Sequence, residues 1–175
     1  MPLEIIIDGY NLIRQSDSLS RLDAQNLEQG REALVERLAR YTKVRNHPVT
    51  VVFDGWGGFS PSSTRTRHKG IQVVYTGQGE TADEWIKGRV GEMQYGAVVT
   101  SDQEIGRSAE RAGLSVISSD VFERRMDAAL AGDREGMAVD EEEWKEEEFI
   151  ETPRKGSARQ LSKKEKRRRA ILKKL

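Results

Sequence analysis

The stretch that decides the fold lies near the start of the chain, where residues 3–11 read LEIIIDGYN. Its three isoleucines form a short β-branched run, which is typical of a strand buried on both faces of a parallel sheet. The run ends at Asp8 and Gly9, so the sequence predicts a strand that stops at a carboxylate.

Four further apolar runs follow, over residues 49–53, 71–75, 97–101 and 114–119, with helical patterns between most of them. This alternation is typical of an α/β domain with a mostly parallel sheet. The capping-box patterns Thr81-x-x-Glu84 and Ser101-x-x-Glu104 predict two of the helix starts. Residues 55–70 are rich in Gly, Ser and Pro and are predicted to form a loop.

Charge divides the chain into three parts. The 175 residues carry 29 basic and 29 acidic side chains, but residues 1–130 hold 18 acids and 16 bases. Residues 131–152 hold 10 acids and 2 bases, whereas residues 153–175 hold 1 acid and 11 bases. We therefore expect a folded domain over 1–130, an acidic segment over 131–152 and a flexible basic tail over 153–175.

Several classes of protein are excluded by composition. The chain has no cysteine, which rules out disulfides, zinc–thiolate sites, iron–sulfur clusters and a thiol nucleophile. It contains no apolar run long enough to span a membrane and no signal-peptide pattern. The sequence therefore predicts a cytoplasmic protein without a membrane partner.

Aspartates follow four of the five predicted strands: Asp8, Asp54, Asp102 and Asp120. Parallel strands end at one edge of a sheet, so these carboxylates are expected to share a crevice. Carboxylates that lie close together repel one another unless a cation is present, and their hard oxygens suit Mg²⁺ or Mn²⁺. Helix capping explains Asp102 and Asp120 without a metal, and a turn explains Asp54 equally well.

Two more acids, Glu80 and Asp83, follow the third predicted strand. With Thr81 as the helix cap, Asp83 lies in the first turn, where the helix dipole favours an anion. That is a sufficient structural reason for Asp83, yet the turn also faces the acidic edge. Both residues are thus within reach of the same metal.

Four motifs occur together: DGYN at 8–11, VVFD at 51–54, ETADE at 80–84 and TSD at 100–102. Over residues 3–130 they resemble the YacP-like NYN domains, a branch of the PIN-like nuclease superfamily. The resemblance implies a three-layer αβα fold with a five-stranded, mostly parallel sheet of order 3-2-1-4-5. It also implies that Asp8 lies beside Asp102.

The same resemblance implies a function. The acidic metal-binding positions of the family correspond to Asp8, Asp83 and Asp102, and the implied activity is metal-dependent cleavage of RNA. We therefore predict an endoribonuclease that uses Mg²⁺ or Mn²⁺ and acts on messenger or ribosome-associated RNA, with the ribosome as a further partner. Glu80 is the candidate to position or deprotonate the attacking water. Neighbouring polar residues are expected to orient ligands or waters: Asn11, Ser101, Asp54 and Asp120.

Basic residues supply the predicted RNA contacts. In the loop 55–70, these are Arg65, Arg67 and Lys69, with Trp56 available to stack on a base, and the loop is expected to border the acidic crevice. A solvated loop explains the same residues equally well. The tail adds non-specific contacts through Lys163, Lys164, Arg167, Arg168 and Arg169. A membrane surface or the acidic segment are alternative partners for the tail.

Three other functions are alternatives to cleavage of RNA. A non-catalytic RNA- or ribosome-binding protein on the same fold is the leading alternative. A phosphatase with a nucleophilic aspartate needs a second acid two residues after Asp8, where this chain has Tyr10. A nucleotide-binding oxidoreductase is disfavoured because Ala82 replaces the third glycine of the G-x-G-x-x-G pattern. The oligomeric state stays open.

Overall fold

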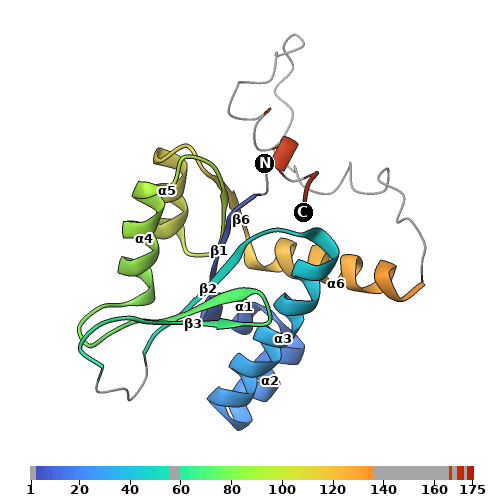
Figure 1. Ribbon diagram of the computed structural model, residues 1–175, viewed down its shortest axis with the longest axis horizontal. Helices are drawn as coiled ribbons and strands as arrows, with labels where there is room; N and C mark the ends of the chain where they lie inside the picture. Colours follow the sequence, from blue (N-terminus) through green and yellow to red (C-terminus); the bar gives the residue numbers. More distant parts are fainter. Residues whose placement is uncertain (1–2, 56–59, 136–165, 167–168, 172) are drawn as a thin grey trace, which may run out of the picture.

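The computed structural model describes residues 3–55, 60–135, 166, 169–171 and 173–175. Within these residues, a sheet has the strand order β3-β4-β2-β1-β5-β6 (Figure 1). Its strands are β1 (Ile5–Asp8), β2 (Val49–Phe53), β3 (Thr64–His68), β4 (Ile71–Tyr75), β5 (Ala97–Val99) and β6 (Ser115–Ile117). All neighbours pair in parallel except β3 with β4. The predicted α/β class is confirmed, and the five expected strands have the expected order.

Strand β3 is the difference from the predicted architecture. It lies within the stretch 55–70 that was expected to be a loop, and it forms an antiparallel hairpin with β4. Lys69 and Gly70 make the turn with positive φ angles of 46° and 96°. All five residues of β3 are exposed. Because the strand has no buried side, it lacks the apolar pattern by which strands are recognised in a sequence.

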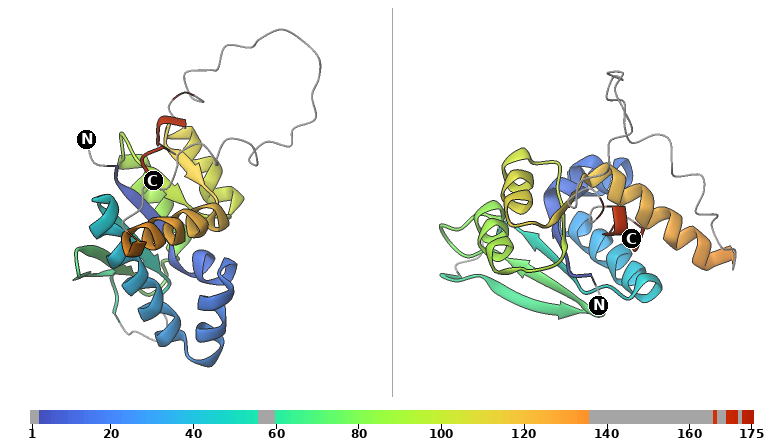
Figure 2. Two further views of the ribbon diagram at one scale, coloured as in Figure 1. Left: turned by 90° about the vertical axis from the view of Figure 1, so that its right-hand side faces the viewer. Right: turned by 90° about the horizontal axis from the view of Figure 1, so that it is seen from above.

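Helices cover both faces of the sheet (Figure 2). One face packs on α1 (Gly9–Gln15), α2 (Asp17–Gln25), α3 (Leu27–Arg45) and α6 (Ser119–Glu135). The other packs on α4 (Ala82–Glu92) and α5 (Gln103–Arg111). Alternate residues of a strand point to opposite faces, so Ile5 and Ile7 belong to the first core and Ile6 to the second. Burial on both sides explains why the central strands are apolar throughout.

Polar side chains fix several helix starts. Thr81 and Glu84 form the predicted capping box at the start of α4. For α5 the predicted box is wrong by one residue, because Asp102 rather than Ser101 caps the helix. Asp8 caps α1 by accepting a hydrogen bond from the backbone of Asn11. Two of the aspartates that end strands thus also start helices.

The end of the chain packs on the domain. Ile171 and Leu175 are buried, and both belong to the core cluster that includes α3. The Tyr41 hydroxyl donates to the Leu175 carbonyl at 3.1 Å, and His47 Nε2 lies 2.7 Å from the Lys174 carbonyl. These contacts differ from the flexibility expected for the tail.

The predicted division at residue 130 falls inside α6, which continues to Glu135. The rest of the predicted acidic segment lies outside the described residues, as does most of the predicted basic tail. In the parts of the chain that are described, no helix is both long and apolar enough to cross a membrane.

Candidate active site

Carboxylates gather where the central strands end. Asp8 is the last residue of β1, Asp54 follows β2, and Asp83 lies in the first turn of α4. Strand β1 lies between β2 and β5, so the strand order reverses here along the chain. Open α/β sheets form their ligand sites at such a point. The structure therefore brings these three residues to the edge at which a site was expected.

Asp8 is the most perturbed acid of this edge. Its Oδ1 accepts a hydrogen bond from the Asn11 backbone at 3.2 Å, and its Oδ2 accepts one from the Thr100 hydroxyl at 3.4 Å. Burial nevertheless raises the pKa of Asp8 to about 6, and the negative charges of Asp54 and Asp83 add to the rise. A carboxyl group in this position is costly to ionise unless a cation approaches it.

Asp54 and Asp83 have different local bonds. Asp54 Oδ1 accepts a hydrogen bond from the backbone of Ala82 at 2.7 Å, so it ties the end of β2 to the start of α4. Asp83 Oδ2 lies 2.7 Å from Lys87 Nζ, which also contacts Glu104 at 2.8 Å. Within the described residues, Asp83 Oδ1 is buried and has no hydrogen-bond partner. Among the described residues, Asp83 therefore keeps one buried carboxylate oxygen whose capacity to accept a bond is unused.

Lys87 was missed by the sequence reasoning, although a signal was present. It follows Asp83 by four residues on a helix, a spacing at which opposite charges meet. Its hydrogen bond to Asp83, followed by that to Glu104, raises the pKa of Lys87. The ammonium group thus supplies a fixed positive charge beside the acidic edge and links α4 to α5.

Asp102 and Asp120 both lie at helix starts, the position for which a structural role without a metal was predicted. Asp102 Oδ1 accepts from the backbones of Glu104 and Ile105 at 2.8 and 3.1 Å. Asp120 lies in the first turn of α6 and pairs with Arg124 at 3.7 Å. Capping is therefore a sufficient structural role for Asp102, and its role as a metal ligand stays a prediction.

Asn11 is the centre of a polar network at the same edge. Its Oδ1 accepts from the Ser101 backbone at 2.8 Å and from the Ser119 hydroxyl at 2.7 Å. Ser101 Oγ in turn accepts from the Ser119 backbone at 3.2 Å. Ser119 is fully buried, and the sequence reasoning missed it together with Thr100. Thr100 directly follows β5 and Ser119 is the first residue of α6. Both are hydroxyl residues at the end of a predicted apolar run, which is the signal that was available.

Glu80 is held by Ser63, which directly precedes β3. The Ser63 hydroxyl donates to Glu80 Oε2 at 2.5 Å. This bond connects the segment before β3 to the turn before α4. Glu80 therefore has a fixed position near the acidic edge.

The predicted RNA-binding residues Arg65, Arg67 and Lys69 are spread along β3 and the turn after it, so they do not all border the carboxylates. Arg65 pairs in register with Val74 and lies over the Trp85 ring of α4, 5.5 Å from its centroid. Lys69 is in the turn at the opposite end of the sheet, where it contacts Glu36 at 2.7 Å. The expectation that the whole stretch borders the crevice is wrong for Lys69, because β3 runs away from the carboxylates.

The remaining predicted RNA contacts are mostly beyond what the structure describes. Arg169 is exposed, and it lies in the short helical stretch 169–171 that ends at Ile171. The others lie outside the described residues: Trp56, Lys163, Lys164, Arg167 and Arg168.

The oxygen donors of this edge fit a hard divalent cation such as Mg²⁺ or Mn²⁺ in their chemistry. The free Oδ1 of Asp83 and the costly ionisation of Asp8 are the two observations that support such a fit. Over the described ranges, however, no group of three His, Cys, Asp or Glu side chains is arranged so that it could hold a metal ion. Binding would therefore have to draw the carboxylates together.

Comparisons with known proteins give a family and relatives of similar fold. The sequence model of the YacP-like NYN domain matches residues 5–172. The uncharacterized protein YacP of Bacillus subtilis is 34% identical over 83 residues, which are 47% of this chain and 48% of that protein. The match thus spans about half the length of this curated relative.

Solved structures extend the similarity. The crystal structure of Rae1 (YacP) from Bacillus subtilis is 26% identical, with a TM-score of 0.63 over 78% of this chain and 79% of that chain. A point mutant of the same protein gives a TM-score of 0.66 at 26% identity, over 76% of this chain and 80% of that one. The likeness therefore covers most of the described fold.

Proposed function

The chain belongs to the YacP-like NYN domain family, a branch of the PIN-like nuclease superfamily, and we propose that it is a metal-dependent endoribonuclease. Its substrate would be messenger or ribosome-associated RNA, and its cofactor Mg²⁺ or Mn²⁺. The observation that carries the proposal is the meeting of Asp8, Asp54 and Asp83 at the edge where the strand order reverses, with Asp8 costly to ionise alone.

In this proposal Asp8, Asp83 and Asp102 hold the ion. When bound, the ion would neutralise charge on the scissile phosphate and lower the pKa of a water molecule. Asp83 offers its unpartnered Oδ1, while Lys87 keeps Oδ2 in place. Asp102 would contribute Oδ2, because Oδ1 caps α5.

The other polar residues position the reacting groups. Glu80, held by Ser63, would orient the attacking water or accept its proton. Asn11 fixes the backbone of Ser101 next to Asp102, so it sets where that carboxylate stands. Loss of Asn11 should therefore weaken metal affinity without removing a ligand.

The test is cleavage of single-stranded and structured RNA with Mg²⁺, Mn²⁺ or a chelator. Asp8→Asn and Asp83→Asn should each abolish cleavage while the protein stays folded. Asp17→Asn, which removes the same charge from an exposed position at the start of α2, should cleave like the wild type. Full activity in the first two variants, or cleavage that survives chelation, would overturn the proposal.

The same assay separates the leading alternative. Binding of RNA without cleavage under any metal condition would favour a non-catalytic RNA- or ribosome-binding protein on this fold. Products that appear inside a circular RNA would identify an endonuclease, since an exonuclease requires a free end.

A further inference from the structure

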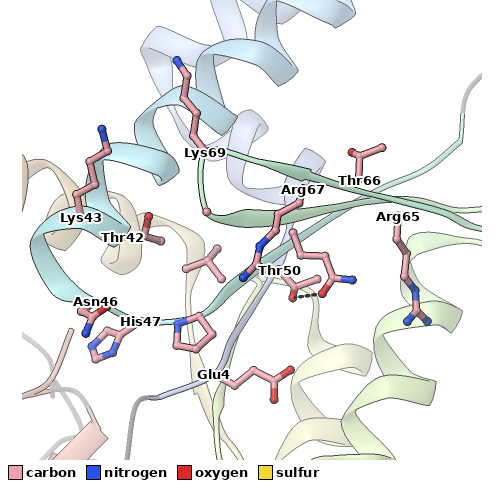
Figure 3. A pocket seen from close by; sticks show the side chains of 14 residues that line it. Glu4, Thr42, Lys43, Asn46, His47, Thr50, Arg65, Thr66, Arg67 and Lys69 are labelled. Carbon is pink, nitrogen blue, oxygen red and sulfur yellow. Dashed lines mark hydrogen bonds between the residues drawn. The ribbon is translucent and has the colours of Figure 1, made fainter.

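A second polar site lies at the other end of the sheet. A pocket of about 830 Å³ is lined by Thr50 of β2, Gln72 of β4, and Arg65 and Arg67 of β3 (Figure 3). Glu4 and His47 stand at its border. None of the residues that line it belongs to the carboxylate edge.

The pocket exists because part of one sheet face carries polar residues. Val52 and Val74 on this face are buried in the core cluster under α4. Two residues earlier on the same strands, the equivalent positions are Thr50 and Gln72, which are paired in register. The Thr50 hydroxyl lies 3.5 Å from Gln72 Oε1, so the floor of the pocket is polar where a helix would require apolar residues.

The pocket has a net positive character. Arg67 pairs in register with Gln72, and Figure 3 shows its guanidinium pointing into the pocket. In the described part of the chain, Arg67 has no ion pair. The acid at the border, Glu4, is already paired with Arg89 at 2.9 Å. An anion in the pocket would therefore meet a free guanidinium and neutral amide and hydroxyl groups.

Arg65 connects this pocket to the carboxylates. It lies two residues before Arg67 on the same face of β3, which separates the two Cα atoms by about 7 Å. It also lies over Trp85 of α4, the helix whose first turn carries Asp83. From Thr50 to Asp54, the distance along β2 is about 13 Å, that of four strand residues.

We propose that this pocket binds the phosphate backbone of RNA, on the side of β3 that leads away from the carboxylate edge. The inference deepens the proposed function, because it places the RNA that flanks the reacting phosphate. Cations repeated along one strand suit a polymer with a charge on every unit. An acidic peptide could also bind the arginines. Only RNA, however, would explain why Arg65 extends the row of cations from the pocket toward the carboxylates.

The experiment measures binding of a labelled single-stranded RNA to the full chain in a chelator, so that cleavage plays no part. Arg67→Gln should lower the slope of log affinity against log salt by about 0.7, which is about fivefold in affinity at about 0.1 M salt. Gln72→Glu should weaken binding further, because it places a carboxylate on the floor of the pocket.

Matched controls carry the same changes in charge at exposed positions that do not line the pocket. Arg21→Gln on α2 and Gln29→Glu on α3 alter exposed positions outside the pocket, and both should bind RNA like the wild type. Equal weakening by pocket and control variants would show a non-specific charge effect and would overturn the proposal. The proposal would also be overturned if Gln72→Glu weakened the binding of an acidic peptide and left the affinity for RNA unchanged.

Cleavage assays then separate this inference from the proposed function. If both hold, Arg67→Gln should raise KM and leave kcat unchanged. If cleavage is found but RNA affinity is insensitive to Arg67 and Gln72, the pocket proposal fails and the nuclease proposal stands. If the variants lose RNA affinity and no cleavage occurs with any metal, the pocket proposal stands alone.

Discussion

Replacement of Asp8 by Asn should stabilise the metal-free protein at neutral pH. The pKa of Asp8 is raised to about 6 from 3.8 by burial, with contributions from Asp54 and Asp83. A rise of about 2 units corresponds to about 3 kcal/mol that the folded state loses when Asp8 ionises. Asparagine avoids this cost, and it still offers an oxygen to the Asn11 backbone as a helix cap.

The sign of the pH dependence follows from the raised pKa. Below about pH 4, Asp8 is protonated in both the folded and unfolded states, so wild type and Asp8→Asn should be equally stable with respect to this group. Between about pH 4 and pH 6, the unfolded state releases its proton first, and the wild type loses stability as the pH rises. The advantage of the variant should therefore grow over this range and stay constant above about pH 7.

Thermal and urea unfolding in a chelator measure this difference. At pH 7 the variant should melt about 6–12 °C above the wild type, for a chain of this size. Addition of Mg²⁺ or Mn²⁺ should stabilise the wild type and not the variant, so the gap should narrow. A variant less stable than the wild type at pH 7, or a gap independent of pH, would refute the reasoning. Asp17→Asn is the control for loss of one charge and should give no such gain.

Three further predictions concern packing. Ile171→Ala should lower the free energy of unfolding by about 2–5 kcal/mol in urea titrations, since Ile171 is buried; a loss below about 0.5 kcal/mol would show that the end of the chain does not pack in solution. Tyr41→Phe should cost about 1 kcal/mol and speed hydrogen exchange near the end of the chain, because it removes the bond to the last carbonyl; unchanged exchange would contradict this. Gly9→Ala should destabilise the protein by about 1–3 kcal/mol in thermal melts, because a Cβ there would lie 2.3 Å from the Phe53 ring. Gly88→Ala, where a Cβ has open space, should instead stabilise α4 by about 0.5–1 kcal/mol, and equal effects of the two changes would refute the clash.

The central strands were predictable from their own residues, whereas the order of the sheet was implied by the resemblance to the YacP-like NYN domains. Ile5–Ile7 and Val49–Phe53 are buried on both faces, so their apolar runs cannot be mistaken for exposed loops. The exposed strand β3 has no such constraint, since its pairing rests on backbone hydrogen bonds to β4. An apolar sequence pattern arises from burial, so a fully exposed strand cannot be recognised by such a pattern.

The candidate site was predictable in place but not in detail. Strand ends located Asp8 and Asp54 at one edge, yet the partner of each oxygen depends on tertiary contacts. Asp54 serves the Ala82 backbone and is the neighbouring charge that most raises the pKa of Asp8, although it was expected only to orient ligands. Asp102 was expected to be a ligand, but one of its oxygens accepts a hydrogen bond that caps α5. Such differences of one bond cannot be read from spacing.

The tail shows the same limit. Ile171 and Leu175 are four residues apart within a basic run, a spacing that gives only a weak amphipathic signal. Their burial depends on a core cluster that includes α3, which lies more than a hundred residues earlier in the chain.

Strand β3 has a consequence for self-association. It forms one border of the sheet, and its outer backbone groups would accept a strand from a second copy of the chain. Charged side chains on a border strand discourage such pairing, so Arg65 and Arg67 would oppose the joining of two sheets edge to edge. Variants that neutralise both arginines should therefore aggregate more readily than the wild type.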